Sequence, residues 1–309
     1  MKILVTGGAG FVGFHLTQLL SKQNNEITIL DNLSNVSKEK LKPLLDEGVN
    51  FIEGNILDFN LLKKILNEKF DLVIHLAAKT DVEESFLYPD LVKEVNVKGT
   101  ENLLKLCIEN KIKNFIAASS AAVYGNSSTF PITENQGLNP ISPYGESKAE
   151  LEKIIQNYSQ NHGINSVCLR FFNIFGKGQS NAYAGVITKF LDKIKKNKDL
   201  VIFGDGSYSR DFIYIDDVLD SIRCAIENIE GKRGNCYNIA TGKPTTIKEL
   251  ANLILSIAKS KLEIKNELPK KGDISYSYAN TELAKKDLKF KSSTKLKDGL
   301  KKLMDFGLY

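Results

Sequence analysis

The chain has 309 residues, with 42 Lys and Arg against 37 Asp and Glu, and its 42% hydrophobic and 26% charged residues are ordinary for a globular protein. This composition excludes disordered, collagen-like and coiled-coil proteins, and no apolar run approaches the ~20 residues that a membrane-spanning helix needs. Four scattered cysteines form no closely spaced pair, so we expect no disulfide framework, no metal site and a cytoplasmic location.

The first 170 residues alternate short β-rich runs with longer amphipathic stretches. Strands are predicted at 2–6, 26–30, 49–53, 72–76, 114–119 and 166–170, and helices at 11–22, 38–45, 61–68, 91–110 and 144–161. This alternation predicts an α/β fold with a doubly wound parallel (Rossmann) sheet. Beyond residue 170, glycine-rich breaks separate helices predicted near 183–196, 216–227 and 247–258. We therefore predict a Rossmann domain at 1–170 and a smaller mixed α/β lobe at 171–309, some segments of which return to the first domain.

A glycine-rich turn follows the first predicted strand. Gly7, Gly10 and Gly13 form the pattern Gly-x-x-Gly-x-x-Gly, with Phe11 and Val12 at the start of the first helix. The first glycine permits a tight turn, the second lets backbone N–H groups approach a pyrophosphate, and the third lets the helix pack close to the sheet. The turn is therefore a candidate dinucleotide site.

Asp31 ends the second predicted strand, 18 residues after Gly13. A carboxylate at this point accepts hydrogen bonds from ribose hydroxyls and repels a 2′-phosphate, which favours NAD over NADP. The alternative is an aspartate that only begins the turn Asp31-Asn32-Leu33-Ser34.

Tyr144 and Lys148 are four residues apart in a predicted helix and therefore share one face. A free tyrosine has a pKa near 10 and is a poor base, but an ammonium about 4 Å away at an effective dielectric of ~20 lowers that pKa by about 3 units. Such a tyrosine can remove a proton from a sugar hydroxyl while the carbinol carbon gives a hydride to NAD. Ser119 and Ser120 end the fifth strand, where a serine hydroxyl can bridge the substrate and Tyr144. The alternative is an ordinary surface pair.

Positive charge gathers near the C-terminal end, where residues 259–302 contain 13 Lys and six acidic residues. No nucleic-acid motif accompanies these lysines, so a solvated surface is favoured, an anionic small molecule remains open, and nucleic acid is not expected. A retained arginine in so Lys-rich a chain indicates a task that lysine cannot perform, such as bidentate phosphate binding. The chain contains only four: Arg170, Arg210, Arg223 and Arg233.

Taken in order, these motifs resemble the extended short-chain dehydrogenase/reductase family, and within it the NAD-dependent nucleotide-sugar epimerase/dehydratase branch. The resemblance covers nearly the whole chain and rests on Thr6–Gly13, Asp31–Ser34, His75–Ala78, Asn96–Thr100, Ser119–Gly125, Tyr144–Lys148, Arg170–Asn173, Gly204–Asp217 and Lys271–Asp273. It implies that residues 1–170 bind NAD and that the lobe at 171–309 mainly binds a nucleotide sugar. It also implies that His75 is structural and not a general base.

The resemblance implies a role for each matching residue. The implied catalytic triad is Ser120, Tyr144 and Lys148. The implied cofactor-binding residues are Gly7, Gly10, Phe11, Val12, Gly13, Asp31, Asn32, Ser34, Asn55, Ile56, Leu76, Ala77, Ala78, Asn96, Ser119, Tyr144, Lys148 and Phe171. The implied substrate-binding residues are Ser120, Asn173, Phe203, Arg210, Lys270, Asp273 and Ser277.

Two positions depart from the family pattern. Asn55 stands where relatives carry an Asp that accepts from the adenine amino group, and its side-chain oxygen can still accept that bond. Lys270 stands where relatives carry an Arg, and lysine binds phosphate without the bidentate fork.

The residues after Ser120 separate the reactions of this branch. Dehydratases place acidic residues there, whereas this chain has Ala121 and Ala122, which cannot transfer protons. We therefore predict a UDP-hexose 4-epimerase with no net redox change. Ser277 aligns with the gate of the hexose pocket, and its small side chain predicts that UDP-glucose and UDP-N-acetylglucosamine are both accepted.

Three other expectations accompany this prediction. Another nucleotide-sugar oxidoreductase or dehydratase is the first alternative, and a non-catalytic NAD-binding regulatory protein is the second. The helices at 91–110 and 144–161 resemble those that form a homodimer interface in the family, so a homodimer is expected.

Overall fold

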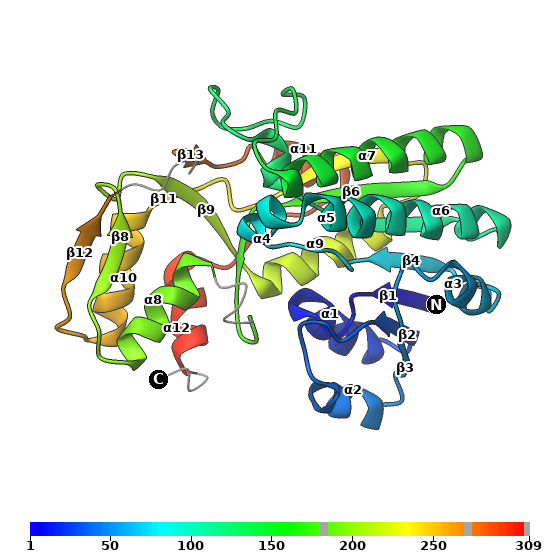
Figure 1. The fold of residues 1–309 in the computed structure, drawn as a ribbon, viewed down its shortest axis with the longest axis horizontal. Coiled ribbons are helices and arrows are strands. Elements are labelled where there is room, and N and C mark those ends of the chain that lie inside the picture. The colour runs from blue at the N-terminus through cyan, green and yellow to red at the C-terminus, as the bar shows by residue number, and fades with distance from the viewer. Residues whose placement is uncertain (180–184, 269–273, 306–309) are drawn as a thin grey trace.

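The computed structural model describes residues 1–179, 185–268 and 274–305. Its centre is a seven-stranded parallel sheet with the order β10-β6-β5-β4-β1-β2-β3 (Figure 1). The strands are β1 (Lys2–Thr6), β2 (Glu26–Asp31), β3 (Asn50–Glu53), β4 (Leu72–His75), β5 (Asn114–Ser120), β6 (Asn165–Phe171) and β10 (Arg233–Ile239). The predicted α/β fold with a parallel Rossmann sheet is confirmed.

Helices cover both faces of this sheet, which explains why its central strands contain continuous apolar runs, such as Ile3–Val5 in β1 and Leu72–Ile74 in β4. One face packs against α1 (Phe11–Ser21) and α9 (Ile215–Glu227), and the other against α3 (Phe59–Leu66), α6 (Gly99–Glu109) and α7 (Pro143–His162). Alternate residues of β1 point to opposite faces, so Ile3 joins the first core and Leu4 the second.

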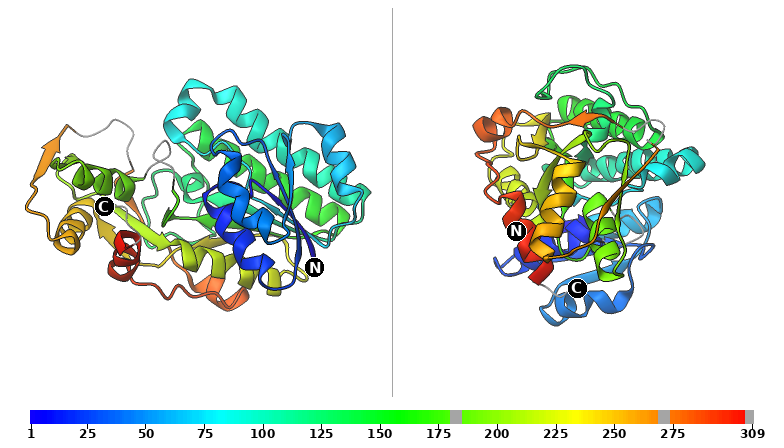
Figure 2. Two further views of the ribbon diagram at one scale, coloured as in Figure 1. Left: turned by 90° about the horizontal axis from the view of Figure 1, so that it is seen from below. Right: turned by 90° about the vertical axis from the view of Figure 1, so that its left-hand side faces the viewer.

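A smaller lobe lies beside the carboxyl ends of the main strands (Figures 1 and 2). It contains β9 (Ser209–Tyr214) paired with β7 (Asn173–Phe175), β11 (Pro244–Thr246) and β13 (Tyr276–Ser277). A second pair joins β8 (Leu200–Phe203) to β12 (Ile264–Glu267). The helices of this lobe are α8 (Val186–Lys195), α10 (Ile247–Ala258) and α12 (Leu296–Asp305).

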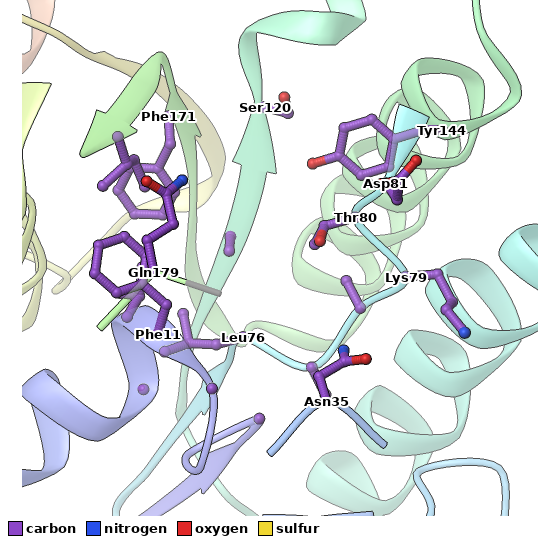
Figure 3. A pocket seen from close by; sticks show the side chains of 18 of the residues that line it. Phe11, Asn35, Leu76, Lys79, Thr80, Asp81, Ser120, Tyr144, Phe171 and Gln179 are labelled. Carbon is purple, nitrogen blue, oxygen red and sulfur yellow. The ribbon is translucent and has the colours of Figure 1, made fainter. Parts of the chain in front are cut away.

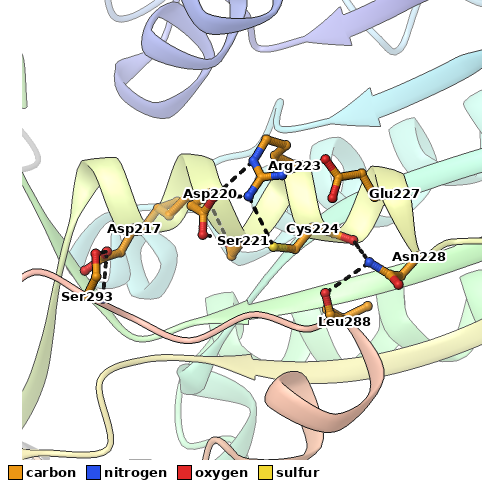
Figure 4. Close-up of polar contacts among 10 residues, drawn as sticks. Asp217, Asp220, Ser221, Arg223, Cys224, Glu227, Asn228, Leu288 and Ser293 are labelled. Carbon is orange, nitrogen blue, oxygen red and sulfur yellow. Dashed lines mark hydrogen bonds and ion pairs between the residues drawn. The ribbon is translucent and has the colours of Figure 1, made fainter.

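The chain crosses between the two parts more than once. Strand β10 adds to the main sheet beside β6, although it follows β8 and β9 of the smaller lobe in sequence. Helix α9 also fastens the C-terminal segment to the sheet (Figure 4): Asp217 accepts hydrogen bonds from Ser293 and Thr294, and the Asn228 amide donates to the Leu288 carbonyl, which follows α11 (Glu282–Asp287). The division at residue 170 stays a prediction.

The predicted helix at 91–110 is confirmed as one continuous helical segment, with a π turn inside it that the sequence pattern did not predict. It consists of α5 (Pro89–Lys93), a π-helical turn (Glu94–Lys98) and α6, and a further helix, α4 (Val82–Leu87), precedes it. A π turn holds one extra residue, and such turns are frequent at functional sites. The predicted helix at 38–45 is likewise a 3₁₀ turn (Lys38–Leu41) followed by α2 (Lys42–Asp46). Among the described helices, none has the length and apolarity to cross a membrane.

Candidate active site

A cavity of about 840 Å³ opens at the carboxyl ends of the main strands and extends toward the smaller lobe. Its lining includes the glycine-rich turn, the segments after β2, β3 and β4, the end of β5, the start of α7 and residues of α8. This is where doubly wound sheets bind their ligands. Figure 3 shows Tyr144, Thr80 and Asp81 on one side of the cavity. Phe11, Phe171 and Gln179 lie on the opposite side.

The glycine-rich turn is built so that only glycine fits at its key positions. Gly7 has φ +72°, and a Cβ there would lie 2.6 Å from the Ala77 backbone nitrogen. A Cβ on Gly13 would overlap the Gly7 carbonyl oxygen. The N-terminus of α1 is therefore held close against β1 and β4 with its backbone open to the cavity, as binding of a pyrophosphate requires.

Asp31 is oriented by two backbone groups at the end of β2. Its Oδ2 accepts from the Ala9 N–H at 3.0 Å and its Oδ1 from the Leu33 N–H at 2.9 Å. Burial raises the pKa of this carboxyl, and the two backbone hydrogen bonds oppose that rise. Each carboxylate oxygen keeps a further lone pair for a ribose hydroxyl, so turn and carboxylate together fit a dinucleotide.

The start of α7 brings Tyr144 against the end of β5. Ser142 caps the helix by accepting from the Gly145 N–H, and a Cβ on Gly145 would lie 2.6 Å from the Ala122 carbonyl oxygen. The missing side chain thus lets the helix approach the 3₁₀ turn Ala121–Tyr124, which Ser120 caps by accepting from the Ala122 N–H at 3.1 Å. Ser120, Tyr144 and Lys148 all line the cavity.

The electrostatics of this triad correct one expectation. Burial raises the pKa of Tyr144, and contact with the Ser120 side chain opposes the rise only in part. The prediction that Lys148 lowers the tyrosine pKa by about 3 units is therefore wrong for this structure. The Lys148 ammonium instead donates to the Ala118 carbonyl at 2.8 Å, and burial lowers the pKa of Lys148 to about 8.

Asn96 lies behind the cavity and not in its lining. Its Oδ1 accepts from the Lys79 N–H at 2.8 Å, and its Nδ2 donates to the Lys79 carbonyl at 2.9 Å and to the Ser147 hydroxyl at 2.9 Å. It thus ties the segment after β4 to the helix that carries Tyr144. The position of Asn96 therefore supports a role in holding the Lys79 backbone in place, and not the predicted direct contact with a cofactor.

His75 is buried in a chain of hydroxyl contacts. Its Nδ1 lies 2.7 Å from the Thr6 hydroxyl and its Nε2 lies 2.9 Å from the Thr100 hydroxyl. Thr100 donates its proton to the Asn96 carbonyl, so His75 must donate through Nε2 and accept at Nδ1. Burial and the nearby charge of Lys148 lower its pKa to about 3. A neutral, fully partnered imidazole is structural, as expected.

Arg170 makes a bidentate contact, but with a carboxylate instead of a phosphate. Its Nε and Nη2 donate to the Glu152 oxygens at 2.9 and 2.7 Å, and both side chains are almost fully buried. Glu152 also accepts from the Ser119 hydroxyl at 2.5 Å, one residue before Ser120. Arg170 thus performs a bidentate task that lysine cannot, but its partner is the buried Glu152 carboxylate and not a phosphate.

The cavity contains most of the predicted cofactor residues. All of them except Asn96 line it, and so do the predicted substrate contacts Ser120 and Asn173. Asn55 lines it with its Oδ1 already accepting from the Leu57 N–H, which leaves one lone pair for adenine.

Other predicted substrate contacts lie elsewhere. Among the described residues, the lining does not include Phe203, Arg210 or Ser277. Arg210 and Ser277 are register partners on β9 and β13. Lys270 and Asp273 lie outside the described residues. The roles of these five residues stay predictions.

Sequence reasoning missed the segment Lys79–Glu83, which lines the cavity together with Gln179 and Lys189. The signal was available for that segment, because it directly follows β4 at the sheet edge where ligands bind. Gln179 and Lys189 lie in the irregular second half, where no sheet position could be assigned from the sequence.

Comparison with known proteins agrees with this geometry. Residues 3–240 match the NAD dependent epimerase/dehydratase family. The chain is 36% identical over 306 residues to a putative UDP-glucose 4-epimerase of Methanocaldococcus jannaschii, with 98% of this chain and 97% of that protein covered. It is 37% identical to a dTDP-D-glucose 4,6-dehydratase of Dictyostelium discoideum, covering 83% of this chain but 62% of that protein. It is also 32% identical to UDP-glucuronate 4-epimerase 4 of Arabidopsis thaliana (98% and 74% covered).

Two solved structures have the same fold throughout. The UDP-glucose 4-epimerase of Thermotoga maritima, determined with UDP-glucose, gives a TM-score of 0.93 at 32% identity and covers 99% of this chain and 98% of its own. The UDP-N-acetylglucosamine 4-epimerase of Methanobrevibacter ruminantium gives 0.93 at 33% identity, with 99% and 97% covered. The family match across residues 3–240 agrees with the nearly full-length relatives and with the glycine turn beside Asp31. This chain is therefore an enzyme of the NAD-dependent epimerase/dehydratase family.

Proposed function

We propose that the protein is an NAD-dependent 4-epimerase of UDP-hexoses, which interconverts UDP-glucose with UDP-galactose and UDP-N-acetylglucosamine with UDP-N-acetylgalactosamine. The observation that carries this proposal is the position of Ser120, Tyr144 and Lys148 in the same cavity as the dinucleotide turn and Asp31. The two similar solved structures are named as 4-epimerases of these two kinds of sugar nucleotide.

The chain's own residues account for the proton steps. Tyr144 takes the proton of the sugar C4 hydroxyl and later returns it, and the Ser120 hydroxyl bridges the sugar oxygen and the phenol. The Ser120 side chain also opposes the rise that burial causes in the pKa of the phenol, and Lys148 adds an ammonium to the lining of the same cavity. The glycine-rich turn and Asp31 would hold NAD, which would supply reversible hydride transfer at C4, so the overall reaction would involve no net oxidation.

Dehydration is the first alternative because one relative is named as a dehydratase. Loss of water requires groups that remove a C5 proton and protonate the leaving C6 hydroxyl. After Ser120 this chain has only the methyl groups of Ala121 and Ala122, on the 3₁₀ turn that Ser120 caps. This observation favours epimerisation.

A direct assay separates the possibilities. Purified protein with UDP-glucose should form UDP-galactose without consuming added NAD, and Tyr144→Phe should reduce turnover at least about a hundredfold. Tyr158→Phe, farther along the same helix, is the matched control and should retain activity. A product that has lost water would indicate a dehydratase, accumulating NADH would indicate an oxidoreductase, and an undiminished Tyr144→Phe enzyme would disprove the proposed chemistry.

Acceptance of the acetylated sugar is tested at Ser277. This buried side chain is the register partner of Arg210, so Ser277→Tyr adds bulk beside a predicted substrate contact. We expect the variant to lose UDP-N-acetylglucosamine turnover while it keeps that of UDP-glucose. Unchanged turnover of the acetylated sugar would remove this argument.

We also propose a cytoplasmic homodimer. Apolar side chains are exposed on α4 and α5, beside α7: Phe86, Leu87, Tyr88 and Leu91. The four cysteines are free thiols, in keeping with a reducing compartment. Light scattering should give about twice the chain mass of 34.4 kDa, and Leu87→Asp should shift it toward the monomer.

A further inference from the structure

The segment that follows β7 completes the cavity lining beside the dinucleotide turn. We call residues Gly176–Gln179 the strap, and two of them, Gly178 and Gln179, line the cavity together with the glycine-rich turn. We propose that His15 holds the strap against this turn as a latch, so that bound NAD stays in the site through the whole reaction. His15 is thus a positioning residue, and the inference requires NAD binding, which the family shares, and not a particular sugar.

One hydrogen bond ties the strap to the helix that begins at the glycine-rich turn. The His15 Nε2 lies 2.7 Å from the Lys177 carbonyl oxygen, and because a carbonyl can only accept, Nε2 carries the proton. The two residues are 162 positions apart in the sequence, so the bond forms only in the folded chain. His15 and Phe11 are four residues apart on α1 and share one helix face, and Phe11 lines the cavity. The latch therefore acts directly beside the predicted cofactor site.

Neighbouring side chains orient the His15 ring, and two glycines bring the strap close to it. The ring makes edge contacts with Phe11 and Phe14, with centroid separations of 6.0 and 5.8 Å. Gly178 has φ +89°, and a Cβ there would lie 3.6 Å from the His15 Nε2. A Cβ on Gly176 would lie only 2.5 Å from a side-chain carbon at the start of α9. The strap is therefore shaped to run against the imidazole.

The other end of the strap is bound to α8. The Gln179 Oε1 accepts from the Thr188 hydroxyl at 3.0 Å, and Val186 and Ile187 of the same helix line the cavity. Figure 3 shows Gln179 on the same side of the cavity as Phe11. The strap is thus held at both ends, by α1 beside the main sheet and by α8 of the smaller lobe.

The proposed reaction gives this attachment a purpose. The site must hold the reduced cofactor until the sugar has been reduced again, because its release in between would leave a 4-keto sugar and an enzyme without oxidised cofactor. Closing the cavity beside the glycine-rich turn slows this release. Loss of one hydrogen bond between neutral groups should raise the rate of NAD release about fivefold.

The test measures how fast NAD leaves the full-length enzyme. Protein loaded with radiolabelled NAD is mixed with excess unlabelled NAD, and the label that remains bound is followed by rapid gel filtration. His15→Leu removes the donor at similar volume, His15→Gln retains an amide donor, and Thr188→Val releases the other end of the strap. His15 is half-buried, so its substitutions leave the packed core intact. The matched control is His162→Leu, which removes an exposed histidine that contacts Tyr158 on α7.

We expect NAD to leave His15→Leu and Thr188→Val about fivefold faster than the parent, and His15→Gln and His162→Leu at nearly the parent rate. Without added NAD, conversion of UDP-glucose by His15→Leu should slow over successive turnovers and recover when NAD is supplied. Release from His15→Leu at the parent rate, or an equal increase in His162→Leu, would overturn the latch. A parent enzyme that retains NAD but leaves UDP-glucose unchanged would instead disprove the proposed function, and the release rates would still decide the latch.

Discussion

The buried pair of Glu152 and Arg170 provides the sharpest test of how the active site is supported. The two side chains are 4% and 6% exposed, and Arg170 donates two hydrogen bonds to Glu152 at 2.9 and 2.7 Å. Arg170→Met leaves the Glu152 carboxylate buried with only the Ser119 hydroxyl as a described side-chain donor. Breaking such a pair on one side costs about 3–5 kcal/mol, because an uncompensated charge remains buried.

The expected magnitude follows from a double-mutant cycle. Arg170→Met and Glu152→Leu should each lower the free energy of unfolding by about 3–5 kcal/mol, whereas the double variant should lose much less than their sum. The chain has no tryptophan, so urea transitions are best followed by far-UV circular dichroism. The exposed pair Lys93 and Glu150, 3.2 Å apart, is the control, and its disruption should cost less than about 1 kcal/mol.

Strictly additive losses at Glu152 and Arg170 would refute this reasoning, since they would show that the two charges do not stabilise each other. Single losses below about 1 kcal/mol would refute the claim that both charges are removed from water.

Three further predictions concern pH, the glycine turn and the cofactor. The pKa of His75 falls from 6.5 to about 3 on folding, so between these pH values the unfolded chain binds more protons than the folded chain. The contribution of His75 to the free energy of unfolding should therefore fall by about 2 kcal/mol from pH 7 to pH 5. Urea transitions of His75→Gln should show a smaller loss of stability between pH 7 and pH 5 than those of the parent. An unchanged pH dependence of stability would contradict the lowered pKa of His75. Gly13→Ala places a Cβ against the backbone of Gly7 and Gly8. The variant should be about 1–3 kcal/mol less stable and should retain less NAD on purification. A fully stable variant with normal NAD content would contradict the close packing of Gly13 against this turn. Asp31→Asn should weaken NAD binding about tenfold, as measured by calorimetry, and should reduce the preference for NAD over NADP. A variant that binds NAD with the affinity of the parent enzyme would exclude the contact between Asp31 and the ribose.

The local signals in the sequence were sufficient for the N-terminal half. Strands β1 to β6 lie within one residue of their predicted bounds, because each is a short apolar run between turn residues. The glycine turn, Asp31, Ser120, Tyr144 and Lys148 were also identified from spacing and family resemblance, and the fold brings all of them to one cavity. These features depend on neighbours in the chain, so local pattern suffices for them.

Contacts between distant segments could not be predicted in this way. The partner of Arg170 is Glu152 on a different element, and Asp81 comes to the same cavity lining as Tyr144 because α4 packs against α7. The charge state of Tyr144 and Lys148 also depends on tertiary structure: i,i+4 spacing indicates proximity, but burial raises the pKa of the phenol and lowers that of the ammonium. The amino-acid sequence by itself thus determined the fold class and the chemical groups of the site. Only tertiary packing decided their surroundings, because burial and long-range pairing arise when segments far apart in the chain exclude water together.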